Sequence, residues 1–504
     1  MYLALTKASE QVILTYSVMT SKGESKRPSY LINRVKQVFP KLVVEKEEMD
    51  TSYEKIMGSD KGKSYLISHL ADGSYAKDVI WWEIASHYEK KTPGILKDLL
   101  RIREKRAGNN SLKKEAAKRL FGDVLYGSVT RFEQYVQCPF AFFSHYGLLL
   151  NERQQYEISS LDHGNLFHQA MEHLSHELEQ RNKNWQDLSE EEAVLLAAEC
   201  VDAVAERYQG RKYFQSNRVS FMLKRLKNEV VHSVWAMWHQ MQEGDFVQTY
   251  TEKGFRGSDK EWESMCIPFD EDAKICLNGV IDRVDLCSLP GEELIKIIDY
   301  KSSDSQDLSL AKVYYGLQMQ LLTYLEAAKE MVEKEHKGKE AVPAAMLYYA
   351  IKEKNLDWKP ESEEEYEKRV LDSMKCKGYV NEEPEIIGHL DKSIVNGGEL
   401  IPGQKSVVVP VAVDKKGLLK KNSETLSTKD FETLIAHTKE KMKECGKAIL
   451  DGKIEAIPYV YEDNDGCTYC PYGSVCGHES KKDGVREMKK MSDDEVWEAL
   501  YGDD

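Results

Sequence analysis

The sequence predicts an α/β fold, and two observations point to it. Two segments rich in Ile and Val, 273–286 and 293–303, are separated by the turn sequence "SLPGE" and have the composition of β-strands. Segments with the helical spacing of apolar residues lie before and after them, at 161–243 and 314–331. Strands placed between long helices are typical of an α/β core, because each face of a sheet must be covered by another layer.

The composition favours a globular protein of more than one domain. The chain has 504 residues, of which 41% are hydrophobic and 31% are charged, and chains of this length usually form several domains. It has no apolar run long enough to span a membrane and no N-terminal signal peptide, so we expect a cytoplasmic protein without a membrane partner. There the 10 cysteines should stay reduced, and clustered ones should bind metal.

The charge distribution bears on nucleic-acid binding. A formal net charge of -15 argues against a nucleic-acid partner. The stretches 97–120 and 211–227 are strongly basic, however, and such helical surfaces can follow a phosphate backbone. Solvated helix faces explain either stretch equally well.

The first 122 residues are expected to form a domain of their own. The opening "MYLALTKASEQVILTYS" predicts a strand, as expected where a chain begins inside a larger domain, and 30–122 predict helices. The chain has no phosphate-binding loop of the GxxxxGK type, so we expect no ATPase activity from it alone. Beyond residue 121 the sequence becomes apolar and aromatic, and Thr130 and Glu133 have the spacing of a capping box at the start of a helix that carries Cys138.

The remaining elements follow from periodicity. The helix at 161–180 has an apolar stripe formed by Phe167, Ala170, Met171, Leu174 and Leu178. Further strands are predicted at 344–351 and 405–413, where β-branched and aromatic residues are dense. The acidic tail, 481–504, ends in "MSDDEVWEALYGDD", which predicts a short helix.

Two aspartates on neighbouring strands form a candidate metal site. In "IIDYKS", Asp299 and Lys301 are two residues apart and therefore point to one face of a strand, and Asp282 in "GVIDRVD" lies on the strand before it. Carboxylates brought together in this way suit Mg²⁺ or Mn²⁺, which can activate water and stabilise charge on a phosphate. Lys301 adds a fixed cation. Taken alone, an Asp-x-Lys pair at the end of a strand is more often a surface ion pair.

An ordered series of motifs strengthens this interpretation. "GNLFH", "GVIDRVD", "IIDYKS" and "QLLTY" follow one another in the chain. Gln320 and Tyr324 are four residues apart and share a helix face. His168 lies beside an apolar stripe and would alone be a core or surface histidine, but within the series it is a candidate metal ligand.

This series resembles the RecB-like nucleases of the PD-(D/E)xK superfamily, over residues 160 to 325. The matching positions are Gly164, His168, Gly279, Asp282, Arg283, Asp285, Asp299, Lys301, Gln320 and Tyr324. The resemblance implies a restriction-endonuclease-like core with a mixed central sheet, large helical additions and a nuclease domain at 123–480. It implies that the metal ligands are His168, Asp282, Asp299 and the carbonyl of Tyr300.

The resemblance also assigns the remaining roles. Lys301 would assist the attacking water, and Gln320 and Tyr324 would organise the site or touch DNA. Gln318 is a rival for the role of Gln320, because "LQMQ" offers both.

Three cysteines, Cys467, Cys470 and Cys476, lie within the stretch "GCTYCPYGSVCGH". Their spacing suits zinc, with His478 as a fourth ligand. The stretch also resembles the cysteine triplet of iron–sulfur nucleases in the RecB-like group, which implies that Cys138 in "QCPFAFF" completes a [4Fe–4S] cluster. Such a cluster would staple the nuclease domain. The other cysteines are expected to be ordinary core or surface residues: Cys200, Cys266, Cys276, Cys287, Cys376 and Cys445.

The opening "YLALTKA" resembles the last conserved motif of superfamily-one helicases, with Lys7 in place of the usual arginine. Together these features resemble the C-terminal portion of the AddB subunits of AddAB helicase–nucleases. The resemblance implies a metal-dependent exonuclease that cuts the 5′-ended strand during processing of double-strand DNA ends for recombinational repair. An AddA partner would supply ATP-driven unwinding and deliver single-stranded DNA. The alternatives are a free-standing RecB-like exonuclease and a non-catalytic DNA-binding scaffold subunit.

Overall fold

The computed structural model describes residues 7–18, 25–44, 59–72, 78–106, 111–151, 160–209, 217–256, 262–302, 307–351, 356–357, 359–478 and 484–502. The chain divides into two compact units, Met1–Gly108 and Asn109–Asp504. The helix Lys114–Phe121 (α6), which precedes the predicted domain boundary near residue 122, belongs to the second unit. Within the described ranges, no helix has both the length and the apolar character needed to cross a membrane.

The first unit contains helices, as the sequence predicts. They are Tyr30–Val38 (α2), Ser59–Asp72 (α3), Val79–Lys91 (α4) and Ile95–Arg106 (α5). Asp78 caps α4 by accepting hydrogen bonds from the backbone N–H groups of Ile80 and Trp81. The Trp81 indole donates to the carbonyl of Leu66 at 2.9 Å, within a small core shared by α3 and α4.

The strand predicted at the start of the chain is not found. Residues 1–6 lie outside the described residues, and 7–18 contain no strand. The side chains of 7–18 are exposed, and a single strand is not stable without a partner that pairs with its backbone.

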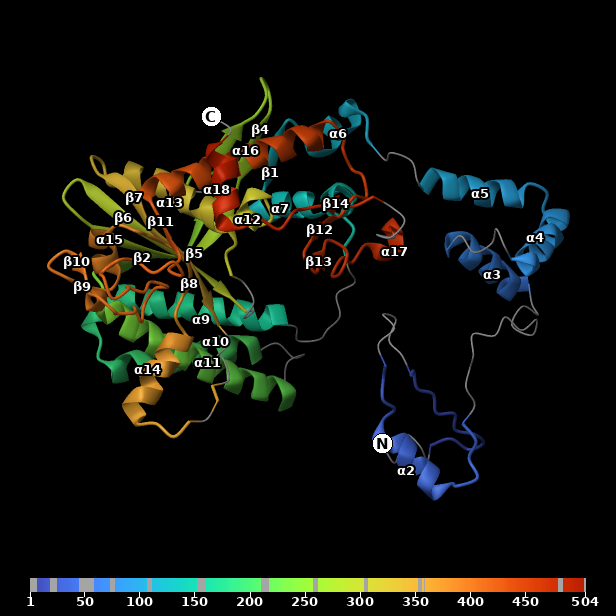
Figure 1. The fold of residues 1–504 in the computed structure, drawn as a ribbon, viewed down its shortest axis with the longest axis horizontal. Helices are drawn as coiled ribbons and strands as arrows, with labels where there is room; N and C mark the ends of the chain where they lie inside the picture. The colour runs from blue at the N-terminus through green and yellow to red at the C-terminus, as the bar shows by residue number, and fades with distance from the viewer. Residues whose placement is uncertain are drawn as a thin grey trace. The chain divides into compact units, whose positions relative to one another are not determined.

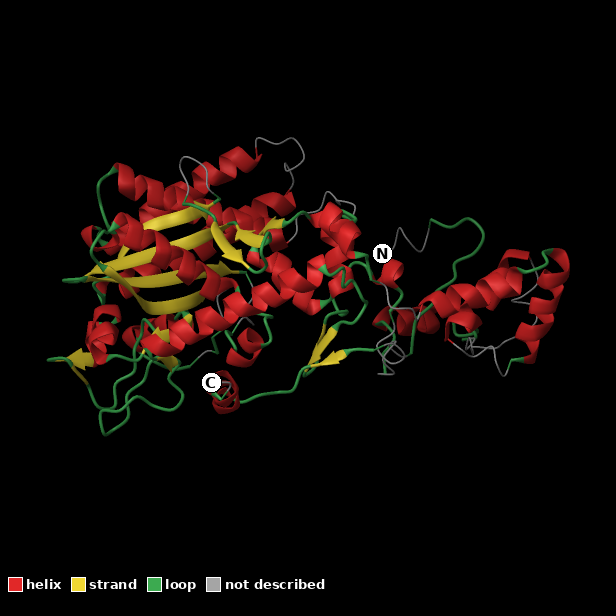
Figure 2. Cartoon of the chain, turned by 90° about the horizontal axis from the view of Figure 1, so that it is seen from above, coloured by secondary structure: helices red, strands yellow, loops and turns green. Residues whose placement is uncertain are grey.

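The second unit is built on a six-stranded sheet. Its strands, in spatial order, are Thr425–Leu426 (β11), Lys377–Asn381 (β8), Glu340–Ala350 (β7), Glu292–Lys301 (β6), Gly279–Ser288 (β5) and Val247–Phe255 (β2). The pairs β2–β5, β5–β6 and β7–β8 are antiparallel, whereas β6–β7 and β8–β11 are parallel. The predicted α/β fold with a mixed central sheet flanked by helices is therefore confirmed (Figures 1 and 2).

Helices cover both faces of this sheet (Figure 1). One face carries Ser160–Gln180 (α9), Glu190–Gln209 (α10) and Asn217–Gln242 (α11), and the other carries Gln320–Glu335 (α13) and Thr428–Leu450 (α16). The alternation of β6 explains both contacts, because Leu294 and Ile298 pack on the first layer and Ile295 and Ile297 on the second. The apolar stripe predicted for α9 is buried in the first layer.

Smaller elements surround the core. The short strands are Val124–Gly127 (β1), Met265–Pro268 (β3), Lys274–Leu277 (β4), Val395–Asn396 (β9), Glu399–Leu400 (β10), Tyr459–Tyr461 (β12), Asn464–Asp465 (β13) and Arg486–Glu487 (β14). The remaining helices are Val129–Gln137 (α7), Pro139–Phe142 (α8), Leu310–Tyr314 (α12), Glu363–Ser373 (α14), Pro384–Leu390 (α15), Gly473–Cys476 (α17) and Asp493–Tyr501 (α18), with a π-helix at Phe143–Gly147 and 3-10 turns at Trp185–Asp187 and Lys392–Ile394. Helix α18 confirms the predicted C-terminal helix, and Ser492 and Glu495 form its capping box.

Two of the strand predictions are wrong in detail. The segment 273–286 forms β4 and β5 in different sheets rather than one strand. The segment 405–413 forms no strand, because the Ser406 hydroxyl accepts hydrogen bonds from the N–H groups of Val408 and Val409 and turns the chain. All of its valines except Val407 are buried although they form no β-ladder, so their β-propensity reflects burial rather than strand pairing.

Two helix starts also differ from the prediction. The helix predicted at 314–331 begins at Gln320, after the separate helix α12. The predicted capping box of Thr130 and Glu133 does not form, since α7 begins at Val129 after Ser128 without a side-chain cap. The Glu133 carboxylate instead accepts a hydrogen bond from the backbone N–H of Met319 at 2.6 Å.

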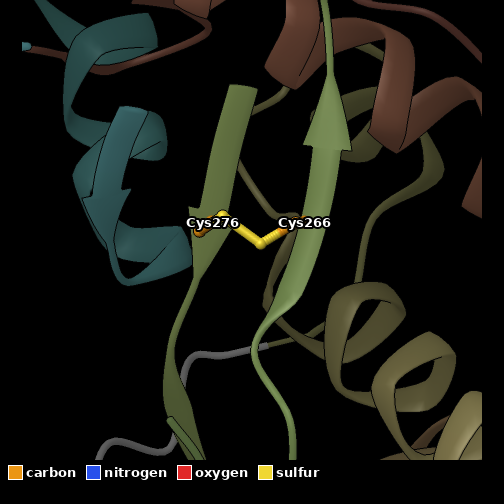
Figure 3. Close-up of a disulfide and its surroundings, with 2 residues drawn as sticks. All are labelled: Cys266 and Cys276. Carbon is orange, nitrogen blue, oxygen red and sulfur yellow. A yellow bond between two sulfur atoms is a disulfide. The ribbon is translucent and has the colours of Figure 1, made fainter. Parts of the chain in front are cut away.

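The expectation that all cysteines are reduced is wrong for one pair. Cys266 on β3 and Cys276 on β4 form a disulfide (Figure 3). They are directly opposite each other in the antiparallel pairing of the two strands, and their Cα atoms are 4.2 Å apart. Cysteines that face each other directly on neighbouring antiparallel strands are close enough to form a disulfide.

Candidate active site

The two predicted aspartates lie where the pairing of β5 with β6 ends. That pairing runs from Ser288 and Glu293 to Arg283 and Ile298, so Asp282 and Asp299 follow directly. Facing residues of antiparallel strands lie on the same side of the sheet. The Asp282 Oδ2 atom accepts a hydrogen bond from the backbone N–H of Tyr300 at 2.7 Å, which ties the two strands together at this point.

A third carboxylate, Glu252 of β2, joins this site and was not predicted from the sequence. The Nδ1 atom of His168 on α9 is 2.9 Å from Glu252 Oε1 and 3.5 Å from Asp282 Oδ1. One ligand atom from each of the three residues lies within 4.8 Å of the others. One imidazole nitrogen and two carboxylate oxygens form a donor set that fits a divalent cation such as Mg²⁺ or Mn²⁺.

The backbone of Glu252 is unusual for a strand residue. Its φ of 45° lies in the left-handed region, which costs a residue with a side chain about 1–2 kcal/mol. It follows an irregularity in the pairing of β2 with β5 between Gln248 and Tyr250. Backbone strain of this kind gathers at functional sites, which supports a role for the Glu252 carboxylate. The only sequence signal for it was one acidic residue in the strand "YTEKGF".

Lys301 lies in a chain of polar contacts beside the three-residue cluster. Its Nζ atom is 2.5 Å from Asp299 Oδ2 and donates to Gln320 Oε1 at 2.9 Å. The Gln320 side-chain amide in turn donates to the hydroxyl of Tyr324 at 2.9 Å. Gln318, its rival in the sequence, instead accepts from the backbone of Ser309 and donates to the carbonyl of Asp307. The structure thus brings Gln320, rather than Gln318, to Lys301.

Burial and mutual repulsion dominate the electrostatics of the site. Burial, followed by the negative charge of Asp299, raises the pKa of Asp282 well above its usual value. Burial also raises the pKa of Asp299, although Lys301 opposes this shift. Burial alone would lower the pKa of His168, but the hydrogen bond with Glu252 and the charge of Asp282 outweigh it and raise that pKa to about 9. A bound cation would relieve this repulsion in place of protons.

Arg283 and Asp285, which match the family motif, lie outside this site. The guanidinium donates to both oxygens of Asp285 at 2.7 and 2.9 Å, and Lys296 contacts the same carboxylate at 2.9 Å. All three side chains are buried, and the alternation of β5 and β6 places them on the face opposite Asp282. We interpret them as a structural ion network, since buried charges persist only when they are paired.

The motif glycines differ in what the structure requires of them. A Cβ atom on Gly279 would lie 2.8 Å from the Phe255 ring and 3.2 Å from the Tyr324 ring. Glycine therefore lets the Phe255 ring pack this closely against β5. A Cβ atom on Gly164 would make an ordinary contact of 3.7 Å with Ser302, so packing alone does not explain that glycine.

The cysteines predicted to share a metal group come together at the C-terminal end of α7. Cys138 is the C-cap residue of α7 and forms a small buried cluster with Ala141 and Tyr472, against which Cys470 packs. Its charge interacts with those of Cys470 and Cys476, and Cys467 interacts with the other three. Burial raises the pKa of the Cys138 thiol, and burial followed by the charge of Asp465 raises that of Cys467 to about 11.

Backbone contacts hold this cysteine region in place. The backbone N–H groups of Ala141 and Phe140 oppose the rise in the pKa of Cys138, but their effect is smaller than that of burial. The Tyr472 hydroxyl lies 2.8 Å from His145 Nδ1 and donates to the carbonyl of Leu150 at 3.1 Å.

Four of the cysteines expected to be ordinary are buried and not disulfide-bonded: Cys200, Cys287, Cys376 and Cys445.

Comparison of the sequence with known proteins shows which family the chain resembles. The profile of the PD-(D/E)XK nuclease superfamily matches residues 127–477, which contain the polar site and the four clustered cysteines. The chain is also 33% identical over 513 residues to an AddB-type subunit of an ATP-dependent helicase/deoxyribonuclease from Lachnoclostridium phytofermentans. Proteins of the same name are 31% identical in Clostridium perfringens and 30% identical in a Thermoanaerobacter species.

These alignments cover the chain almost completely but the relatives only in part. They include 100% of the chain for the first relative and 99% for the other two, and 43% of each relative. The predicted resemblance to AddB-type subunits is confirmed, and it concerns the C-terminal 43% of those proteins. Since the superfamily profile spans most of the sequence, the chain belongs to the PD-(D/E)XK nuclease superfamily.

Proposed function

We propose that this chain is the nuclease region of a helicase–nuclease subunit and hydrolyses phosphodiester bonds of DNA with a divalent cation. The observation that carries the proposal is the group of His168, Glu252 and Asp282 beside the Asp299–Lys301 pair. It combines a hard-ligand set with a fixed cation, the two elements that metal-assisted hydrolysis of a phosphodiester needs. Asp299 and the carbonyl of Tyr300 remain proposed as further ligands.

Each side chain of the site has a separate role in this proposal. When bound, a divalent cation would lower the pKa of an attacking water and stabilise charge on the phosphate. Lys301 holds its ammonium group beside the Asp299 carboxylate, where it would stabilise the negative charge that develops on a bound phosphate. Gln320 keeps that ammonium in place, and Tyr324 keeps Gln320 in place. The two hydrogen bonds fix the long lysine side chain before the substrate arrives.

The substrate and partner are inferred from the relatives, whose name describes an ATP-dependent helicase/deoxyribonuclease. We propose that the chain acts as an exonuclease on the 5′-ended strand when double-strand DNA ends are processed for repair. ATP-driven unwinding would come from outside these 504 residues, which contain no phosphate-binding loop of the GxxxxGK type, and from the relatives we propose an AddA-type partner as its source. We also retain the proposal that 1–122 is the end of a helicase-like domain.

For Cys138, Cys467, Cys470 and Cys476 we propose a [4Fe–4S] cluster. The four thiols lie close enough to interact electrostatically, which supports one group held by all four thiolates. The choice of an iron–sulfur cluster over zinc rests on the resemblance of this stretch to the cysteine triplet of iron–sulfur nucleases.

A nuclease assay on single-stranded DNA with the 504-residue chain tests the function. The wild-type chain is expected to cleave DNA with Mg²⁺, and Asp282→Ala is expected to lose cleavage while it keeps its fold and DNA binding. Asp272→Ala removes an exposed carboxylate in a turn and is the matched control. Cleavage by Asp282→Ala at the wild-type rate would contradict the proposal, and DNA binding without cleavage by the wild type would favour a scaffold role.

A further inference from the structure

Helix α13, which carries Gln320 and Tyr324, has no cap of its own. Its N-cap residue is Met319, whose side chain makes no capping hydrogen bond. The first N–H groups of a helix have no partner within the helix, and a buried N–H group without a partner is costly. Met319 is fully buried, so water does not satisfy its own N–H group.

Glu133 supplies the missing cap from another helix. It lies on α7, and its Oε1 atom accepts from the N–H of Met319 at 2.6 Å. The backbone N–H of Gln320 also favours the charged form of this carboxylate. A carboxylate at this place satisfies the Met319 donor and interacts favourably with the helix dipole. The contact joins positions 186 residues apart in the sequence.

The environment of Glu133 shows that this contact borders the active site. Burial raises its pKa to about 7, while the hydrogen bond from Met319 and the charge of Lys301 oppose the shift and the charge of Asp299 adds to it. The Glu133 side chain is therefore close enough to the Asp299–Lys301 pair for both charges to affect its pKa. A carboxyl group is kept in such a place only where its hydrogen bonds compensate for burial.

The first turn of α13, which Glu133 caps, also carries the residue that contacts Lys301 of β6. Gln320, the first residue of α13, accepts the hydrogen bond from Lys301. Any shift of this first turn moves the Gln320 oxygen relative to Lys301, and the contact of Gln320 with Tyr324 moves with it. Placement errors of about 1 Å in such an arrangement can lower a rate by about a hundredfold.

We propose that Glu133 is a positioning residue of the nuclease: it fixes the first turn of α13, so that Gln320 holds the Lys301 ammonium group beside Asp299. The inference rests on the proposed nuclease function for its effect on rate. Its structural part, the capping of Met319 from α7, can be measured without any cleavage.

The test compares Glu133→Ala, which removes the acceptor, with Glu133→Gln, which keeps a carbonyl oxygen. Thr130→Ala changes an exposed residue one turn earlier on α7 and is the control. In Glu133→Ala we expect hydrogen exchange of the amides at 319–320 to rise about tenfold or more, as local opening becomes easier. We expect the single-turnover rate at saturating single-stranded DNA to fall about tenfold to a hundredfold with unchanged DNA affinity.

Glu133→Gln is expected to restore most of the amide protection and of the rate, which a general packing defect would not do. Wild-type exchange or a wild-type rate in a folded Glu133→Ala chain would overturn the inference. If Glu133→Ala does not fold, Glu133→Asp, which withdraws the carboxylate by one methylene, must show the same losses, and a wild-type rate in it would overturn the inference. If the wild-type chain cleaves no DNA, the proposed function fails, and the exchange measurement still decides the inference.

Discussion

Replacement of Glu252 by Gln is expected to lower the pKa of His168 and weaken the metal site. The substitution keeps the size of the side chain but removes the negative charge 2.9 Å from His168 Nδ1. That pKa is raised from 6.5 to about 9, and one pKa unit corresponds to about 1.4 kcal/mol. Because Asp282 and Asp299 share in the shift, we expect the change to lower it by about 1 unit or slightly more.

The sign of this shift sets a pH dependence of stability in the metal-free chain. The folded pKa of His168 lies above the unfolded value, so the protonated imidazole stabilises the fold fully below a pH of about 6.5. This contribution is lost as the pH rises through about 9. Glu252→Gln should therefore lower the free energy of unfolding by about 1–2 kcal/mol near pH 6 and by much less near pH 10.

Urea unfolding in the presence of a chelator measures this difference, and calorimetry at pH 8 measures the affinity for Mn²⁺. The affinity is expected to fall about tenfold or more, because a ligand is lost. Glu271→Gln, an exposed carboxylate in a turn, is the matched control. A Glu252→Gln chain with the wild-type pH dependence of unfolding and the wild-type Mn²⁺ affinity would refute the reasoning.

Three further substitutions test other parts of the molecule. Lys301→Ala is expected to lower the single-turnover cleavage rate by about 10²–10³-fold, and a change in DNA affinity alone would count against its role. Cys470→Ser, purified without oxygen, should lose the brown colour and iron content of the wild type, whereas a colourless wild type with stoichiometric zinc would exclude the iron–sulfur cluster. Gly279→Ala should lower the unfolding free energy by about 1–3 kcal/mol, because its Cβ would lie 2.8 Å from the Phe255 ring, and an unchanged melting temperature would contradict that packing.

The part of the site that follows from periodicity could be predicted. The alternation in "IIDYKS" placed Asp299 and Lys301 on one face above Ile295 and Ile297, and the structure has them there. Spacing along a helix likewise placed Gln320 and Tyr324 together. Such predictions succeed because side-chain direction within one element is set by local geometry.

The residues that sequence reasoning missed depend on contacts between distant elements. Glu252 reaches His168 through a left-handed backbone that no alternation reveals. Glu133 has the local spacing of a capping box but bonds to Met319 on another helix. The disulfide between Cys266 and Cys276 depends on the register of two strands. Each is fixed by tertiary placement, which overrides local pattern.

Metal-assisted hydrolysis at the cluster of His168, Glu252 and Asp282 is the central proposal for this protein. The rate of single-stranded DNA cleavage by the wild-type chain as a function of Mg²⁺ concentration tests it most directly. We predict no cleavage with excess chelator, a saturable rise with Mg²⁺, and no such rise in Asp282→Ala. Cleavage that is independent of Mg²⁺, or that survives in Asp282→Ala, would contradict it.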